Sequence, residues 1–152
     1  MELSAHRPVF CITGASGYIG RHLVRTLVAR EGAIVRALSK NRNATDLIHP
    51  DVTEIQGDLR QPGTLTGFLV SECTVINLAY GYSDTSAENL VATKHLVDAC
   101  QESKIKRLIH CSTAAVYGGN REDVVNEGTS CSPSTEYGVT KLLIEQILHE
   151  GS

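Results

Sequence analysis

Residues 9–20 read V-F-C-I-T-G-A-S-G-Y-I-G, a short apolar run that leads directly into three spaced glycines. The apolar run predicts a β-strand, and the amphipathic pattern after Gly20 predicts a helix. A helix N-terminus offers unpaired N–H groups and partial positive charge, which suit a pyrophosphate, and glycine lets the backbone lie close to it. The stretch therefore predicts a phosphate-binding turn. Its G-x-x-G-x-x-G spacing differs from the usual G-x-G-x-x-G, so an ordinary glycine-rich turn stays the alternative.

Strand and helix patterns alternate along the rest of the chain. Further strands are predicted at residues 33–38, 51–56, 74–79 and 107–113, and helices after Gly20 and at residues 62–70, 87–103 and 134–149. Such alternation favours a parallel sheet with right-handed crossovers. We expect an α/β, doubly wound fold with strand order 3-2-1-4-5, formed by residues 1–152 as a single domain. Ligands of such sheets bind beyond the carboxyl ends of the strands.

Composition excludes several classes of protein. The net charge is −3 and the Lys and Arg residues are scattered, which argues against nucleic-acid binding. No apolar run is long enough to span a membrane, and the first residues lack a signal-peptide pattern, so we expect a cytoplasmic protein. The five cysteines form no C-x-x-C pair, and neither cysteines nor histidines have metal-ligand spacing. Cys11 and Cys111 are interpreted as buried strand residues, and His95 and His110 are assigned no role.

The end of the second predicted strand bears on cofactor choice. In a dinucleotide-binding unit an acidic residue at this place binds the adenosine ribose. Here Ser39 occupies it, and Lys40 and Arg42 follow, so two cations are available for a 2′-phosphate. The pattern favours NADP over NAD. The alternative is that both cations lie in a solvated loop.

Tyr137 and Lys141 are four residues apart in the last predicted helix and are therefore neighbours on its surface. An ammonium beside a phenol lowers the pKa of the phenol and prepares it for proton transfer. Thr113, at the end of the fifth predicted strand, could hold a substrate oxygen. The alternative is that Tyr137 and Lys141 are ordinary surface residues without a chemical role.

Several motifs occur in the order typical of one family: T-G-A-S-G-Y-I-G, G-D-L, N-L-A, C-S-T-A-A-V-Y-G and Y-G-V-T-K, between residues 13 and 141. Together they resemble the extended short-chain dehydrogenase/reductase family, and more closely its NAD(P)-dependent nucleoside-diphosphate-sugar epimerases and dehydratases. The resemblance implies a Rossmann fold and hydride transfer between a sugar carbon and a nicotinamide, with a nucleotide sugar as substrate.

The resemblance also implies roles for particular residues. Tyr137 would be the acid/base, Lys141 would bind the nicotinamide ribose and lower the pKa of Tyr137, and Thr113 would hold the reacting oxygen. Asn89 would be mainly structural. Cofactor contacts are implied for Gly14, Ser16, Gly17, Tyr18, Ile19, Gly20, Ser39, Lys40, Arg42, Asp58, Leu59, Leu78, Ala79, Tyr137 and Lys141.

The chain departs from the family in length. It ends at Ser152, soon after the Tyr137 helix, so we expect it to lack the carboxyl-terminal substrate domain. The fifth strand would then be an apolar sheet edge that another chain could cover, and the two long helices could pair as in the family's dimers, so we expect a homo-oligomer. Two alternatives to the epimerase or dehydratase stay open: a carbonyl reductase of the dihydroflavonol or hydroxysteroid type, and a dinucleotide-binding module without turnover.

Overall fold

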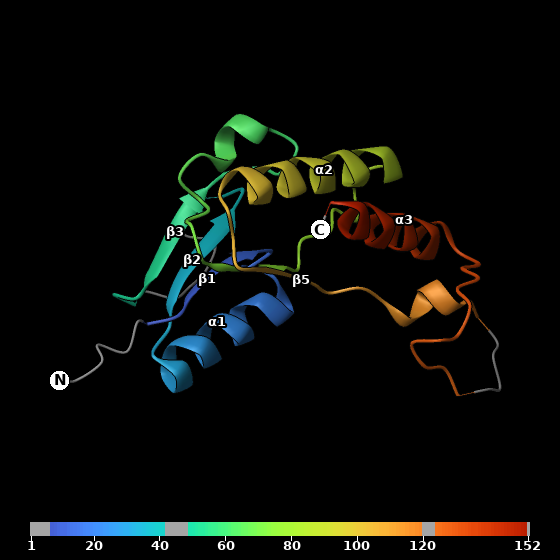
Figure 1. Cartoon of the computed structure of the whole chain (residues 1–152), viewed down its shortest axis with the longest axis horizontal. Helices are drawn as coiled ribbons and strands as arrows, with labels where there is room; N and C mark the ends of the chain where they lie inside the picture. Colours follow the sequence, from blue (N-terminus) through green and yellow to red (C-terminus); the bar gives the residue numbers. More distant parts are fainter. Residues whose placement is uncertain (1–6, 42–48, 120–123, 152) are drawn as a thin grey trace.

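A computed structural model describes residues 7–41, 49–119 and 124–151, and its sheet contains five parallel strands (Figure 1). The strands are β1 (Val9–Thr13), β2 (Ile34–Ser39), β3 (Val52–Gln56), β4 (Thr74–Asn77) and β5 (Arg107–His110). Their order is β3-β2-β1-β4-β5, which confirms the predicted order and the Rossmann-like α/β class. Successive strands are added on one side of β1 up to β3 and on its other side from β4 onward, so a crevice is expected where β1 and β4 end.

Helices lie on both sides of this sheet. The helix α1 (Tyr18–Glu31) lies on one side in Figure 1, and α2 (Ser86–Glu102) and α3 (Glu136–Glu150) lie on the other. The helix α2 begins with a capping box between Thr85 and Glu88, and Thr135 caps α3 by accepting from the Gly138 N–H. Two short 3₁₀ helices, η1 (Pro62–Leu65) and η2 (Ala114–Tyr117), complete the elements.

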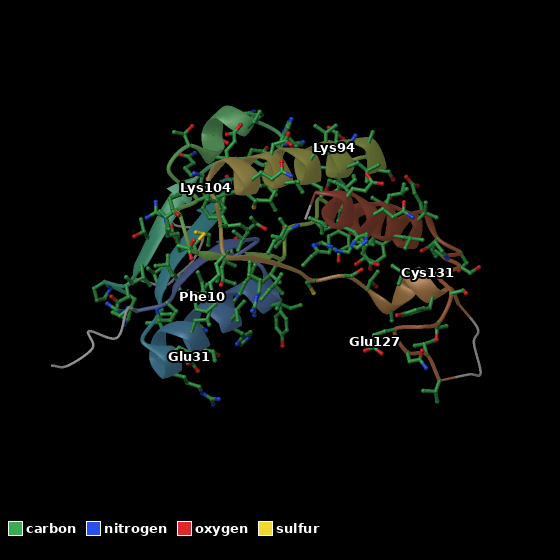
Figure 2. The ribbon with its side chains drawn as sticks, viewed as in Figure 1. Phe10, Glu31, Lys94, Lys104, Glu127 and Cys131 are labelled. Carbon is green, nitrogen blue, oxygen red and sulfur yellow. The ribbon has the colours of Figure 1, made fainter. Side chains whose placement is uncertain are left out.

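Two apolar clusters fill the space between the sheet and its helices (Figure 2). One contains Ile12, Val24 and Leu27 and joins the sheet to α1. The other contains Phe68, Val75 and Leu96 and joins the sheet to η1 and α2. The central strands β1 and β4 are therefore buried on both faces, as parallel strands usually are, and they hold the site rigidly.

Some predicted boundaries and environments were wrong. The helix predicted at residues 62–70 ends at Leu65, because Gly67 has a φ of 76° that no α-helix accommodates. Phe68 and Leu69 are buried nonetheless. The fifth strand ends at His110 rather than at residue 113, and Cys111, expected to be buried in it, is exposed just beyond its end. Cys11 is buried as expected.

Within the described residues, no helix is long and apolar enough to cross a membrane. The same part of the chain contains no group of three or more His, Cys, Asp or Glu side chains that could hold a metal ion.

Candidate functional site

A cleft of about 700 Å³ opens at the carboxyl ends of β1, β2 and β4 and reaches α3. It brings together nearly all of the residues proposed from the sequence. Those that line it are Gly14, Ser16, Gly17, Tyr18, Ile19, Gly20, Ser39, Lys40, Asp58, Leu59, Leu78, Ala79, Tyr137 and Lys141. Thr113 is not among the lining residues, and Arg42 lies outside the described residues.

The glycine turn forms the floor at one end of this cleft. Gly14 has a φ of 68°, and a Cβ there would lie 2.8 Å from the carbonyl carbon of Leu78, so only glycine fits between β1 and β4. A Cβ on Gly20 would overlap the Gly14 carbonyl oxygen. Gly17 is the N-cap of α1 and has no side chain to cap it, and the first turn contains no acidic residue. The first residues of α1, Tyr18, Ile19 and Gly20, line the cleft, and the N–H groups of a first helical turn suit the pyrophosphate of a dinucleotide.

Charged side chains surround Asp58 at the rim of the cleft. Arg60 Nη2 lies 2.8 Å from Asp58 Oδ2, and Arg60 Nη1 lies 3.2 Å from Asp84 Oδ1. The hydrogen-bonded Arg60 guanidinium lowers the pKa of Asp58 to about 2. Lys40 Nζ lies 3.6 Å from Asp58 Oδ2 and 3.8 Å from Asp84 Oδ2. The ammonium of Lys40 is thus already paired with two carboxylates, which weakens the case for Lys40 as a 2′-phosphate ligand.

A chain of polar side chains runs across the strand ends toward α3. Thr13 Oγ1 lies 2.5 Å from Asn77 Oδ1, Asn77 Nδ2 lies 3.2 Å from His110 Nδ1, and His110 Nε2 lies 3.2 Å from Lys141 Nζ. Lys141 also donates a 2.7 Å hydrogen bond to the Cys111 carbonyl. Thr13, Asn77 and Lys141 are 1%, 2% and 4% exposed. We call the side chains of Thr13, Asn77, His110 and Lys141 the polar chain.

Burial governs the ionisation of the polar chain. It lowers the pKa of His110 to about 4, with the Lys141 charge acting in the same direction, so the imidazole is neutral at physiological pH. Burial also lowers the pKa of Lys141, whereas electrostatic interactions with Cys111 and Glu145 act to raise it. The ammonium lies 5.5 Å from the centre of the Tyr80 ring, in the geometry of a cation–π contact.

The ring of Tyr137 packs against the rings of Tyr80 and Tyr82. Its ring lies 5.0 Å from that of Tyr80, edge to face, and 6.0 Å from that of Tyr82, which stacks on it. Burial raises the pKa of Tyr137, and the hydroxyl of Tyr82 adds to the rise. The pKa of Tyr137 is thus raised in this structure, and the ammonium of Lys141 contacts His110 and the Cys111 carbonyl; that Lys141 lowers the pKa of Tyr137 stays a prediction.

Thr113 lies between the end of β5 and η2. Its hydroxyl caps η2 by accepting a 3.2 Å hydrogen bond from the Ala115 N–H. A hydrogen bond between the Thr113 side chain and Tyr137 acts to lower the pKa of Tyr137, against the larger effect of burial. Thr113 is thus a neighbour of Tyr137, although it does not line the cleft.

The sequence analysis missed the polar chain and left His110 without a role. The available signal was positional: Thr13, Asn77 and His110 are the last residues of β1, β4 and β5, which are neighbours in the sheet. Asn89 has the structural role expected of it. Its side chain bonds the backbone N–H and carbonyl of Gly81 at 2.9 and 3.0 Å and so orders the loop beside the cleft.

Known proteins resemble this chain over nearly its whole length. It is 30% identical over 159 residues to an uncharacterised UDP-glucose epimerase of Bacillus subtilis, covering 91% of this chain and 50% of that protein. It is 31% identical over 149 residues to the UDP-glucose 4-epimerase of Halalkalibacterium halodurans, covering 91% of this chain and 44% of that protein. The chain thus spans about half the length of the curated relatives it matches.

Solved structures agree in fold. The protein MoeE5, in complex with UDP-glucose and NAD, superposes with a TM-score of 0.75 at 30% identity, over 95% of this chain and 48% of that one. The enzyme WbmG of Bordetella bronchiseptica, in complex with NAD, gives a TM-score of 0.80 at 20% identity, over 99% of this chain and 52% of that one, which shows the fold alone. The family model of NAD dependent epimerases and dehydratases matches residues 10–151. With its glycine turn, its cleft and this match, the chain belongs to the NAD dependent epimerase/dehydratase family.

Proposed function

We propose that this chain forms the NAD(H)-binding part of an enzyme that epimerises or dehydrates a nucleotide sugar. The observation that carries the proposal is a cleft that connects an uncapped glycine turn to the side chains of Tyr137 and Lys141. Family membership supports the same reading. The similar protein MoeE5 is in complex with UDP-glucose and NAD, and this supports a nucleotide sugar as the substrate class.

The residues of the cleft fit a dinucleotide in its expected orientation. The N–H groups after Gly17 would hold the pyrophosphate, Asp58 would accept from the adenine, and Lys141 would donate to the nicotinamide ribose. A bound nicotinamide would supply the acceptor and donor of hydride. NAD(H) is favoured over NADP(H) because the ammonium of Lys40 is paired with Asp58 and Asp84. A 2′-phosphate would therefore meet carboxylates as well as a cation.

Tyr137 is proposed as the acid/base, with Thr113 holding the reacting oxygen beside it. Because burial raises the pKa of Tyr137, its hydroxyl keeps its proton at neutral pH. This state suits the step in which a keto group receives a proton. The opposite step, removal of a proton from a sugar hydroxyl, requires a lower pKa of Tyr137. The pKa falls if the Tyr82 hydroxyl gives up its contact with Tyr137 and if positive charge lies nearer to the phenol.

A dehydrogenase acting on a smaller hydroxy acid is the second candidate. A D-erythronate dehydrogenase of Haemophilus influenzae is 24% identical over 160 residues, covering 93% of this chain and 49% of that protein. Such an enzyme would use the same cofactor cleft with a single hydride transfer. The two candidates separate by substrate: UDP-glucose or UDP should bind in the first case, and D-erythronate in the second.

A homo-oligomer is also proposed, on the basis of exposed apolar residues. Ile109 on the edge strand β5 is 43% exposed, and Val139 and Leu143 on α3 are 42% and 39% exposed. Apolar side chains at an open sheet edge and on a terminal helix are commonly covered by a partner. Sedimentation of the chain at several concentrations tests this, and a monomer at all of them would refute it.

Calorimetric titration of the chain with NAD(H) and NADP(H) tests the central proposal. We expect NAD(H) to bind and NADP(H) to bind more weakly. A Gly17→Leu variant should lose affinity at least tenfold, because a side chain there would occupy the phosphate cradle. Gly63→Leu is the matched control, since a Cβ at Gly63 meets nothing within 4 Å and Gly63 lies outside the cleft. Equal losses in both variants, or no dinucleotide binding at all, would refute the proposal.

A second experiment tests the acid/base assignment. In the protein as its gene encodes it, Tyr137→Phe should reduce kcat by about 10²-fold or more while the affinity for NAD(H) stays unchanged. Tyr117→Phe serves as the control, because it also replaces a tyrosine by phenylalanine and Tyr117 does not line the cleft. Unchanged turnover in Tyr137→Phe would remove Tyr137 from the reaction.

A further inference from the structure

We propose that His110 is a positioning residue for Lys141 and that Thr13, Asn77, His110 and Lys141 form one directional hydrogen-bond chain, whose direction is set by the charge on Lys141. The chain joins three neighbouring strand ends to α3 through contacts of 2.5, 3.2 and 3.2 Å. In the proposed function Lys141 binds a ribose, so the functional part of this inference rests on that proposal, whereas the hydrogen-bond pattern does not.

The surroundings of Lys141 indicate that its amino group is charged. The Cys111 carbonyl accepts from it at 2.7 Å, the Tyr80 ring faces it at 5.5 Å, and His110 Nε2 lies 3.2 Å away. A carbonyl and an aromatic face are acceptors that suit an ammonium and offer no proton in return. The remaining neighbour, His110 Nε2, is therefore expected to act as the third acceptor.

That acceptor role fixes the rest of the chain. If Lys141 donates to Nε2, the neutral imidazole carries its proton on Nδ1. The structure places Asn77 Nδ2 against His110 Nδ1 and Asn77 Oδ1 against the Thr13 hydroxyl. A proton on Nδ1 therefore requires the opposite amide orientation, with the amide oxygen toward His110 and the amide nitrogen donating to Thr13 Oγ1. The two orientations differ only in which amide atom faces each neighbour.

Loss of the charge on Lys141 permits the opposite direction. A neutral amine can accept a proton from Nε2, the ring then accepts at Nδ1 from the Asn77 amide nitrogen, and the Thr13 hydroxyl donates to the amide oxygen. A charged lysine facing an Nε2–H group would place two donors against each other in a buried site. Charge, ring tautomer and amide orientation therefore change together.

The Asn77 backbone also hydrogen-bonds the His110 ring and acts to raise its pKa, whereas the other neighbours lie against Lys141. From α3, Glu145 faces Lys141 and accepts from the Ser112 hydroxyl. From the end of β5, Cys111 offers its carbonyl, and from the loop after β4, Tyr80 offers its ring. The ring nitrogens of His110 contact Asn77 and Lys141. The chain therefore holds the ammonium in place before any ligand binds.

The tautomer can be measured directly by two-bond ¹H–¹⁵N correlation spectra of the histidine rings, with His110→Gln identifying the His110 signals by their loss. We expect a neutral ring protonated at Nδ1 at pH 7, which takes up a second proton only far below the ordinary histidine range. In Lys141→Met the ring should titrate at higher pH and lose its tautomer preference. A ring protonated at Nε2 at pH 7, or a titration unchanged by Lys141→Met, would overturn the proposal.

Rescue by a shape-conserving variant tests the positioning role. Glutamine at position 110 can accept from Lys141 and donate to Asn77, so His110→Gln should keep NAD(H) affinity within about threefold, whereas His110→Phe should weaken it about tenfold. His49→Gln and His49→Phe are matched controls, since His49 lies outside the cleft beside Asp51. Equal affinity in His110→Phe and wild type would refute positioning. If wild type binds no dinucleotide, the proposed function fails, and the ring spectra still decide the hydrogen-bond pattern.

Discussion

The two ends of the cleft hold charge in opposite ways. Near the rim, Asp58, Arg60, Asp84 and Lys40 neutralise one another in ion pairs of 2.8–3.8 Å, and Lys40 is 54% exposed in its side chain. At the other end, Lys141 is 4% exposed and is held by neutral acceptors. Water screens the first group and can replace any lost partner, whereas nothing replaces a lost partner in the second. Similar distances therefore imply different energies.

The largest effect is expected from breaking the polar chain. Asn77→Leu removes the amide that bonds both the Thr13 hydroxyl and His110 Nδ1 in a buried site, and should lower the free energy of unfolding by about 2–4 kcal/mol. Arg60→Met, which keeps most of the side-chain stem, should lower it by less than about 1 kcal/mol. Urea denaturation of both variants measures the difference. Equal losses would show that the two ends are energetically alike.

A smaller effect should appear in the pH dependence of stability. The pKa of His110 in the fold, about 4, lies below its ordinary value of 6.5, so the unfolded chain binds the proton first. The stabilisation is therefore complete above pH 6.5 and is lost as the pH falls toward 4, by about 2 kcal/mol at most for this partly buried ring. In His110→Gln the free energy of unfolding should change much less between pH 6.5 and pH 4. A slope that survives in His110→Gln would assign the effect to another group.

Asp58 should act in a separate, lower window. Its pKa of about 2 lies below the ordinary 3.8 because of Arg60, so its contribution is present above pH 3.8 and is lost as the pH falls toward 2. Arg60→Gln should return the titration of the Asp58 carboxyl carbon toward its ordinary range, and 0.5 M NaCl should do so in part. The His110 ring signals should not respond to this salt. A salt response of equal size at both ends would contradict the difference in exposure.

Much of the fold could be predicted because strand and helix patterns alternate clearly and crossovers are right-handed. The strand order and the glycine turn at residues 14–20 followed from these rules. Boundaries were less certain where one residue decides the end of an element. Gly67 ends a helix that the apolar pattern would continue, and β5, an edge strand with one neighbour, ends at His110 instead of at residue 113.

The parts of the candidate site that depend on residues close together in the sequence could be predicted. The parts that depend on tertiary packing could not. The spacing of Tyr137 and Lys141 shows that they share a helix surface, but it does not show that Lys141 turns inward. That direction depends on how α3 packs against the end of β5, and the burial that raises the pKa of Tyr137 depends on tertiary packing as well. The partners of Lys40 belong to residues 18 and 44 positions away, so the spacing gave no sign of them.

The polar chain also has a consequence for how the molecule folds. Its bonds join residues separated by 64, 33 and 31 positions in the sequence. Closing such long loops costs conformational entropy before any contact repays it, so contacts of this kind form slowly. The pairing of β1 with β2 through α1 joins residues 25 positions apart (Val9 with Ile34), a shorter separation than any of these three. We therefore expect protection of the Lys141 amine from chemical labelling to appear late in refolding, which makes this buried cation a reporter of the completed sheet.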